Sequence, residues 1–146
     1  MGLSATVYLI SSEMYQRAVE GNSEAFNSGD FSVSYNLDKS WHAIHYLLTG
    51  KNNLGFLDGL QLEVGEEHME VHSPEKIAKL NKQLTENPPS ELALGISFTE
   101  LNEKEIYPGT WSDSSDIGYI RTNLEIFAGA ISEASKNGGA LFVTIL

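Results

Sequence analysis

Residues 140–146 constrain the fold more than any other segment of this chain. Nearly all of them are apolar, and β-branched and aromatic side chains are frequent, which is typical of a β-strand. The segment lacks the alternation of a strand that has one wet face, so it predicts a strand buried on both faces of a sheet. The rest of the chain must therefore cover this strand from two sides.

Partner strands are predicted from composition and from alternation with a period of two residues. The first is Ala5–Ile10, which is rich in β-branched and aromatic residues and can lie beside 140–146. Shorter strands are predicted where apolar residues alternate with polar ones, at Leu60, Leu62 and Val64, at Met69 and Val71, and over residues 31–35.

The longest predicted helix covers residues 115–136 and ends at Gly138. Its apolar residues recur at intervals of three and four, the spacing of a helix face that packs on a core. Tyr119 and Ile126 lie nearly opposite that face, so the helix is either central in the fold or half exposed to a partner, and we favour central packing. The core-facing residues are Ile117, Ile120, Leu124, Phe127 and Ile131.

A second helix is predicted over residues 39–49, between Asp38 as its N-cap and Gly50 as its terminating glycine. Another begins at Ser73-Pro74-Glu75, because serine caps helices and proline suits the first helical position. Shorter helices are predicted after Ser11 or Ser12, from Ser90 and over 101–105. The core face of the helix over 39–49 comprises Trp41, Ile44, His45 and Leu48, broadened by Leu47, whereas His42, Ala43 and Tyr46 lie outside it.

These elements predict an α+β fold in a single compact domain that spans residues 1–146. We expect a small mixed sheet containing the N-terminal and C-terminal strands, packed with several helices, the longest of which lies near the C-terminus. A chain of 146 residues buries about 70% of the surface that its unfolded form exposes, so it can hold a proper hydrophobic core.

The chain is acidic, with a formal net charge of -11, and it has no Lys or Arg between Lys51 and Lys76. Such a field repels phosphate backbones, so we expect no direct nucleic-acid binding. The acidic run is either a solvated surface that keeps the protein soluble or a docking face for a basic protein partner. The candidate residues of that face are Glu63, Glu66, Glu67 and Glu70.

Several chemistries are excluded or unsupported. The absence of cysteine removes disulfides, thiolate nucleophiles and cysteine zinc sites, and fits a reducing compartment, so we expect a cytoplasmic protein. No apolar segment approaches the roughly 18 residues of a membrane span. The sequence patterns of phosphate loops, dinucleotide loops, nucleophile elbows and zinc or calcium motifs are missing. We therefore expect no cofactor and no metal, and we favour a protein that is not an enzyme while keeping an enzyme as the alternative.

All four histidines fall in two close pairs, His42 with His45 and His68 with His72. A shared metal site is not expected, because the first pair diverges by about 60° around its helix, and in a strand the second pair would be about 13 Å apart. His45 is either a half-buried ring bonded to backbone or an acid/base group at the edge of a pocket. It is the one weak catalytic candidate.

Two large aromatic side chains, Tyr107 and Trp111, flank a turn that contains Pro108 and Gly109. They are either packing anchors with a hydrogen-bonded polar tip or walls of a ligand site. Together with Trp41 and His45 they define a candidate ligand pocket.

The run Leu37-Asp38-Lys39, Trp41, His45 and Leu48-Thr49-Gly50, followed by Ile106-Tyr107-Pro108-Gly109, resembles the YfbM-like family of uncharacterised bacterial proteins. The resemblance covers essentially the whole chain. It implies a compact α+β domain from a bacterial cytosol. It supplies no catalytic residue, because no activity is established for that family.

Three functional hypotheses follow from these observations. The first is a non-enzymatic binding protein that holds a basic protein partner with its acidic face, as a toxin-neutralising immunity protein does. The second is a small-molecule-binding protein or enzyme with a pocket around Trp41, His45, Tyr107 and Trp111. The third is a structural subunit that uses Tyr119 and Ile126 in an oligomer interface. The sequence itself does not specify the oligomeric state.

Overall fold

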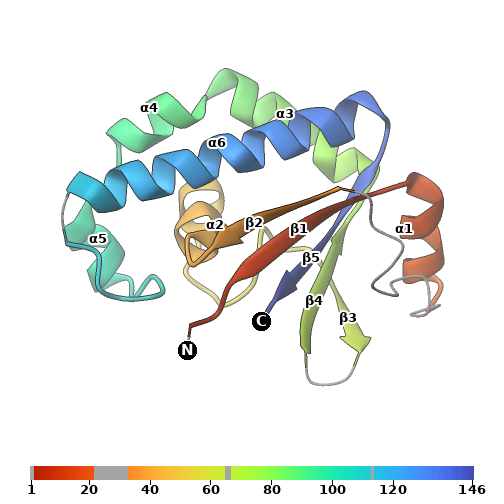
Figure 1. The fold of residues 1–146 in the computed structure, drawn as a ribbon, viewed down its shortest axis with the longest axis horizontal. Coiled ribbons are helices and arrows are strands. Elements are labelled where there is room, and N and C mark those ends of the chain that lie inside the picture. Colours follow the sequence, from red (N-terminus) through yellow and green to blue (C-terminus); the bar gives the residue numbers. More distant parts are fainter. Residues whose placement is uncertain (1, 22–32, 65–66, 113) are drawn as a thin grey trace.

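The computed structural model describes residues 2–21, 33–64, 67–112 and 114–146. Within these ranges the strands form one sheet in the order β2-β1-β5-β4-β3, and helices cover it (Figure 1). The strands are β1 (Ala5–Ile10), β2 (Ser34–Asp38), β3 (Leu60–Val64), β4 (Glu67–His72) and β5 (Ala140–Ile145). The helices are α1 (Ser12–Val19), α2 (Trp41–Thr49), α3 (Pro74–Glu86), α4 (Pro89–Leu94), α5 (Phe98–Glu103) and α6 (Ser114–Lys136). The fold is α+β, as predicted.

The central strand is β5, which lies between β1 and β4 and is buried along its whole length. This confirms the prediction of a strand that is buried on both faces and lies beside Ala5–Ile10. Both pairings are antiparallel, and so are those of β1 with β2 and of β3 with β4. The sheet is therefore antiparallel throughout and not mixed as expected, because none of its neighbouring strands form the parallel pair that a crossover connection would produce.

The two faces of the sheet pack against different cores. Leu141, Val143 and Ile145 of β5 face the main core, which the sheet shares with α2, α3 and α6. Ala140 and Phe142 face a smaller cluster that α1 covers. Helix α6 crosses the first face, and α3 and α4 lie beside it (Figure 1). The described residues contain no helix that is long and apolar enough to cross a membrane.

Helix α6 lies at the centre of the helical layer, where it packs against α3, α4 and β2. The predicted stripe is fully buried from Ile120 onward, whereas Ile117 is partly exposed. Tyr119 and Ile126, the two candidates for an oligomer interface, are partly buried against the same core. Helix α6 is therefore packed centrally in the fold, which is the alternative favoured from the sequence.

Helix α2 begins at Trp41, two residues later than predicted, because Asp38 does not cap it. Asp38 is the last residue of β2, has a φ of 51°, and accepts a hydrogen bond of 2.7 Å from the Tyr119 hydroxyl. Its carboxylate therefore ties β2 to α6. The end of the helix is as predicted, with Gly50 in the left-handed region at a φ of 73°.

The first turn of α2 is buried on all sides. His42 and Ala43 were expected outside the core face, yet both are buried, whereas Leu47 and Leu48 are only partly buried. The reason is the segment that follows the helix, residues 51–59, which folds back and covers this turn.

Candidate functional site

The four side chains of the predicted pocket do not converge on one cavity. Trp41 stacks on Tyr107 with ring centroids 5.6 Å apart, and its indole N–H donates to the Leu3 carbonyl at 3.0 Å. Trp111 is buried elsewhere, and its indole N–H donates to the Ile106 carbonyl at 3.0 Å. Trp41 lines one cavity and Trp111 another, which also includes Asp38, Lys39 and Tyr119. The aromatic residues serve as packing anchors whose polar tips are satisfied.

His45 lies in the core and has both ring nitrogens engaged. Its Nδ1 accepts the Leu57 backbone N–H at 2.8 Å, so the ring proton must lie on Nε2, which donates to the Asn53 side-chain oxygen at 2.9 Å. The ring is fully buried. A histidine in this state holds residues 53–57 in place and has no free nitrogen for acid/base chemistry.

His42 has the same arrangement one turn earlier. Its Nδ1 accepts the Tyr107 N–H at 2.7 Å, and its Nε2 lies 3.0 Å from the Asn52 carbonyl and 3.1 Å from the Asn53 carbonyl. Burial lowers the pKa of His42 below its ordinary value, against the opposing effect of the two carbonyls. Both histidines of α2 therefore hold the segment 51–59 in place by hydrogen bonds of their ring nitrogens.

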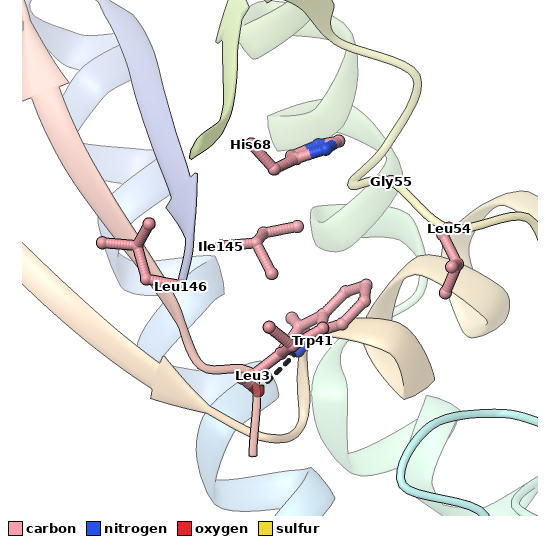
Figure 2. Close-up of a pocket in the computed structure, with 7 residues that line it drawn as sticks. All are labelled: Leu3, Trp41, Leu54, Gly55, His68, Ile145 and Leu146. Atoms are coloured by element: carbon pink, nitrogen blue, oxygen red, sulfur yellow. Dashed lines mark hydrogen bonds between the residues drawn. The ribbon is translucent and has the colours of Figure 1, made fainter. Parts of the chain in front are cut away.

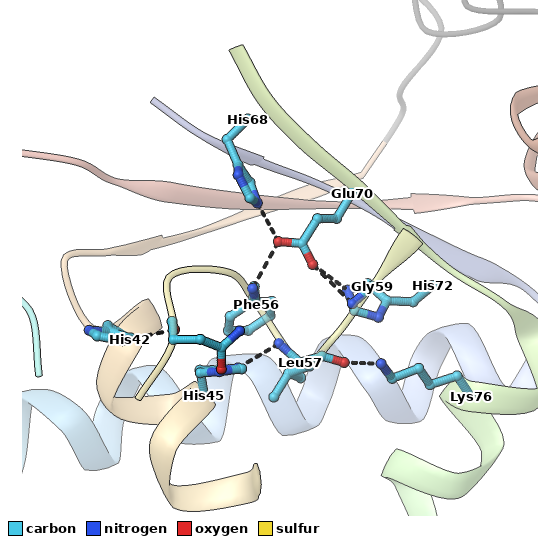
Figure 3. Close-up of polar contacts among 10 residues, drawn as sticks. His42, His45, Phe56, Leu57, Gly59, His68, Glu70, His72 and Lys76 are labelled. Atoms are coloured by element: carbon cyan, nitrogen blue, oxygen red, sulfur yellow. Dashed lines mark hydrogen bonds and ion pairs between the residues drawn. The ribbon is translucent and has the colours of Figure 1, made fainter. Parts of the chain in front are cut away.

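The opposite side of this segment is held by Glu70 of β4 (Figure 3). Its Oε2 accepts the Phe56 N–H at 2.8 Å and its Oε1 accepts the Gly59 N–H at 3.0 Å. Only 1% of Glu70 is exposed. The expectation that Glu70 belongs to an exposed docking face is wrong, because this carboxylate is directed into the protein to bind backbone donors.

For the other candidate residues of the acidic face, the structure gives only the backbone position or none. Glu66 lies outside the described residues, as does Gly65. Glu63 is in β3 and Glu67 in β4, and the backbone places each opposite a residue of the other strand.

Two histidines flank Glu70 on the same face of β4. His68, Glu70 and His72 are opposite Ile145, Val143 and Leu141 of β5, so all three face the main core. The Nε2 of His68 lies 2.5 Å from Glu70 Oε2, and the Nε2 of His72 lies 3.9 Å from Oε1. Strand β4 therefore places the imidazole rings of His68 and His72 on either side of the buried Glu70 carboxylate.

His72 is buried without a hydrogen-bond partner for either ring nitrogen among the described residues. Its ring meets Phe56 edge to face, with centroids 6.4 Å apart. Burial, reinforced by the positive charge of Lys76, lowers the pKa of His72 to about 3. The ring is therefore neutral at physiological pH.

The segment 51–59 is held in a strained conformation. Leu57 and Asp58 both have positive φ, 57° and 55°, which is rare for residues with bulky side chains. The Lys76 ammonium donates to the Leu57 carbonyl, and Lys51 pairs with Asp58 at 2.9 Å. Surrounding contacts thus fix a conformation that the chain alone would avoid, a feature common at functional sites.

A cleft of about 370 Å³ opens beside this segment (Figure 2). Its walls come from the N-terminal segment, α2, the loop after α2, β4 and the end of β5. Most of the lining is apolar, and His68 is its one titratable side chain. The lining residues are Leu3, Trp41, Leu54, Gly55, His68, Ile145 and Leu146.

This arrangement can accept an apolar group and offer it one polar contact. His68 is 29% exposed, so its ring borders the cleft while Glu70 binds it from within. Among the described residues, no group of three His, Asp or Glu side chains is placed to hold a metal ion.

Sequence reasoning named Glu70 and His68 but missed the roles that the structure gives them. The signal was present, because His68, Glu70 and His72 are two residues apart and side chains with that spacing share one face of a strand. The histidine pairing alone leaves out the glutamate between them, and the acidic run around Glu70 indicates an exposed position.

Comparison with known proteins places the chain in a family. A family profile described as "Domain of unknown function (DUF1877)" matches residues 1–144. The crystal structure of YfbM from Escherichia coli, a protein of unknown function, has the same fold, with a TM-score of 0.68 at 20% sequence identity. That match covers 98% of this chain and 99% of YfbM. No curated protein matches. The chain therefore belongs to the DUF1877 family.

Proposed function

We propose that this protein binds a small, largely apolar molecule in the cleft beside His68. The observation that carries the proposal is the clustering of exposed leucines. Leu3, Leu54 and Leu146 are 44%, 70% and 55% exposed, and all three border this cleft. Exposed apolar side chains that gather around a concavity mark a binding site more often than scattered ones do.

The shape and rigidity of the cleft support the proposal. Its volume of about 370 Å³ is within the usual range for small-molecule sites. Leu54 and Gly55 belong to the segment that His45 and Glu70 hold from two sides. A wall fixed before the ligand arrives reduces the entropy lost on binding.

We favour binding over catalysis because of the lining chemistry. The seven lining residues include one acid/base group, His68, and no hydroxyl or thiol nucleophile. His45, the catalytic candidate from the sequence, has both nitrogens occupied in the core.

The test uses the two tryptophan indole N–H signals in a ¹H–¹⁵N spectrum. Trp41 lines the cleft and Trp111 does not, so they serve as reporter and internal control. Titration with 1-hexanol or its isomer methyl pentyl ether should shift the Trp41 signal to saturation. Leu54→Asp should abolish the shift, and Leu94→Asp, at an 88% exposed position on α4, should not.

Two results would contradict the proposal. One is the absence of a saturable Trp41 shift with both probes. The other is an equal effect of the two aspartate variants, which would show that binding does not depend on the cleft.

A basic protein partner is the second candidate, favoured by the net charge of -11. With Glu70 buried, the remaining candidates for the proposed face are Glu63 of β3, Glu67 of β4 and Glu66, which lies outside the described residues. Reversing the charge of Glu63 and Glu67 should then release a partner captured from the native host, whereas Leu54→Asp should not. A captured protein that tolerates the reversal would remove this candidate.

We also propose that the protein works in the bacterial cytoplasm. The cysteine-free sequence supports this location. Fractionation of a native host that expresses the tagged protein tests it, and recovery from any other compartment would contradict it.

A further inference from the structure

Glu70 contacts the buried side of His68 and so influences which ring nitrogen of His68 carries a proton. Backbone N–H groups of Phe56 and Gly59 each donate to one of the two carboxylate oxygens, at 2.8 and 3.0 Å. The Nε2 of His68 approaches one of the same oxygens at 2.5 Å. Three donor groups thus surround Glu70, and an ionised carboxylate, which only accepts, satisfies all of them.

This arrangement favours one tautomer of His68. The neutral form of the ring donates to Glu70 when its proton lies on Nε2, and Nδ1 then carries a lone pair. Glu70 is 1% exposed and His68 is 29% exposed, so the carboxylate lies behind the ring and the open part of the ring borders the cleft. For this tautomer, the polar contact that the cleft offers is a hydrogen-bond acceptor.

An acceptor selects for a ligand that donates. We propose that the cleft preferentially binds apolar alcohols, with the ligand hydroxyl donating to His68 Nδ1 and its hydrocarbon part lying among Leu3, Leu54 and Leu146. This inference rests on the proposed binding function and names its ligand class. Carboxylates are disfavoured, because they only accept and because the chain carries a net charge of -11. Glu70 is a positioning residue, since it acts on the ligand through His68.

The test compares 1-hexanol with methyl pentyl ether at pH 8. The two are isomers with the same atoms, and only the alcohol has an O–H donor. In the wild-type protein the alcohol should bind about five-fold tighter, the change expected for one neutral hydrogen bond. Hexanoate should bind more weakly than either.

Two variants separate this contact from general packing. His68→Phe keeps a ring in the wall and removes both nitrogens, so the alcohol and the ether should bind equally. Glu70→Gln leaves one acceptor oxygen among the three donors and adds amide N–H groups, so His68 is no longer held firmly in one tautomer and the preference should fall. Each variant is checked for folding by the position of its Trp111 indole signal, and if Glu70→Gln does not fold, His68→Phe decides the test.

The possible outcomes separate a failure of the alcohol preference from a failure of the binding function on which it rests. If both isomers bind with equal affinity to the wild-type cleft, the alcohol preference is wrong and the binding function stands. If the preference survives in His68→Phe, Nδ1 is not the acceptor and the inference is wrong. If neither isomer binds, the proposed function fails and the inference fails with it. Long-range ¹H–¹⁵N couplings of His68 provide an independent check, and a proton on Nδ1 in the wild-type protein would overturn the assignment.

Discussion

Glu70 organises the site because it is an acceptor surrounded by donors. A buried carboxylate is stable only when its charge is met by hydrogen bonds or an opposite charge. Here the donors are the N–H groups of Phe56 and Gly59 and the ring of His68. Each of them would lose its partner if Glu70 were truncated, so this residue matters for both the loop and the cleft.

The close approach of Gly59 to this group leads to the first prediction. A Cβ at Gly59 would lie 2.7 Å from Glu70 Oε1 and 2.7 Å from His72 Nε2, and both side chains are buried. Gly59→Ala should therefore lower the free energy of unfolding by about 1–3 kcal/mol, as measured by urea denaturation. Gly129→Ala is the control, because nothing lies within 4 Å of its Cβ position in α6, and it should stabilise the protein by about 0.5–1 kcal/mol. Equal effects of the two changes would contradict the prediction.

His72 predicts a dependence of stability on pH. Its pKa in the folded protein is about 3, because of burial, whereas an unfolded histidine titrates near its ordinary value of 6.5. Between these values position 72 binds one more proton in the unfolded chain than in the folded chain. The contribution of His72 to the free energy of unfolding should thus fall by about 1.4 kcal/mol per unit as the pH decreases through this window.

The variant His72→Phe isolates this contribution. It removes a ring whose nitrogens have no hydrogen-bond partner among the described residues, so it should be tolerated at pH 7.5. The loss of stability between pH 7.5 and pH 5.0 should be smaller in the variant than in the wild-type protein, as measured by denaturant unfolding. His42 remains in both proteins and cancels in the comparison. An identical loss in both would show that His72 does not cause the dependence.

At the scale of elements, the site is formed where the segment 51–59 is held between α2 and β4. The helix contributes His42 and His45, and the strand contributes Glu70. Two of the four histidines, His42 and His45, contact this segment, and the other two, His68 and His72, lie beside the Glu70 carboxylate. His42 and His45 stabilise the backbone conformation of the segment, and only His68 among the four borders the cleft.

Which elements could be predicted depended on whether their signals were local. Ala5–Ile10 and the start of α3 at Ser73 were predicted correctly because composition and capping act within a few residues. The contacts of Glu70 with Phe56 and of His42 with Tyr107 join residues 14 and 65 positions apart. No local pattern encodes such pairings, so the burial of Glu70 and the role of His42 could not be read from the chain.

The cap of α3 provides a prediction at this scale. The Ser73 hydroxyl oxygen accepts the Lys76 N–H at 3.1 Å, which satisfies a donor that the helix itself cannot. Ser73→Ala should reduce the thermal midpoint, in line with a loss of about 1 kcal/mol. Ser90→Ala, at an exposed position within α4, should change it little. Similar midpoints for the two variants would mean that the cap contributes nothing measurable.

At the scale of the molecule, repulsion between like charges opposes the packing of the hydrophobic cores. The formal charge of -11 produces self-repulsion in the compact state, whereas the two cores on either side of the sheet hold it together. The balance between them depends on ionic strength, because dissolved ions screen repulsion between exposed charges at separations beyond about 10 Å at 0.1 M salt.

This balance predicts that added salt stabilises the protein. Raising NaCl from 10 to 300 mM should increase the thermal midpoint by a few degrees, because screening relieves the repulsion. The exposed ion pairs Arg17–Glu13 and Arg121–Glu125 contribute little and should not reverse the sign. A midpoint that falls with salt would show that attractive pairs dominate. Calorimetry over the salt series measures the effect.

The central position of β5 has a consequence for synthesis on the ribosome. Strands β1 and β2 form one half of the sheet and β3 and β4 the other, and β5, which comes after all of them in the chain, is the strand that joins the halves. Chains are made from the N-terminus at about 5–20 residues per second. Until residues 140–145 leave the exit tunnel, the nascent chain can form two hairpin-like pieces with open edges but cannot close the sheet.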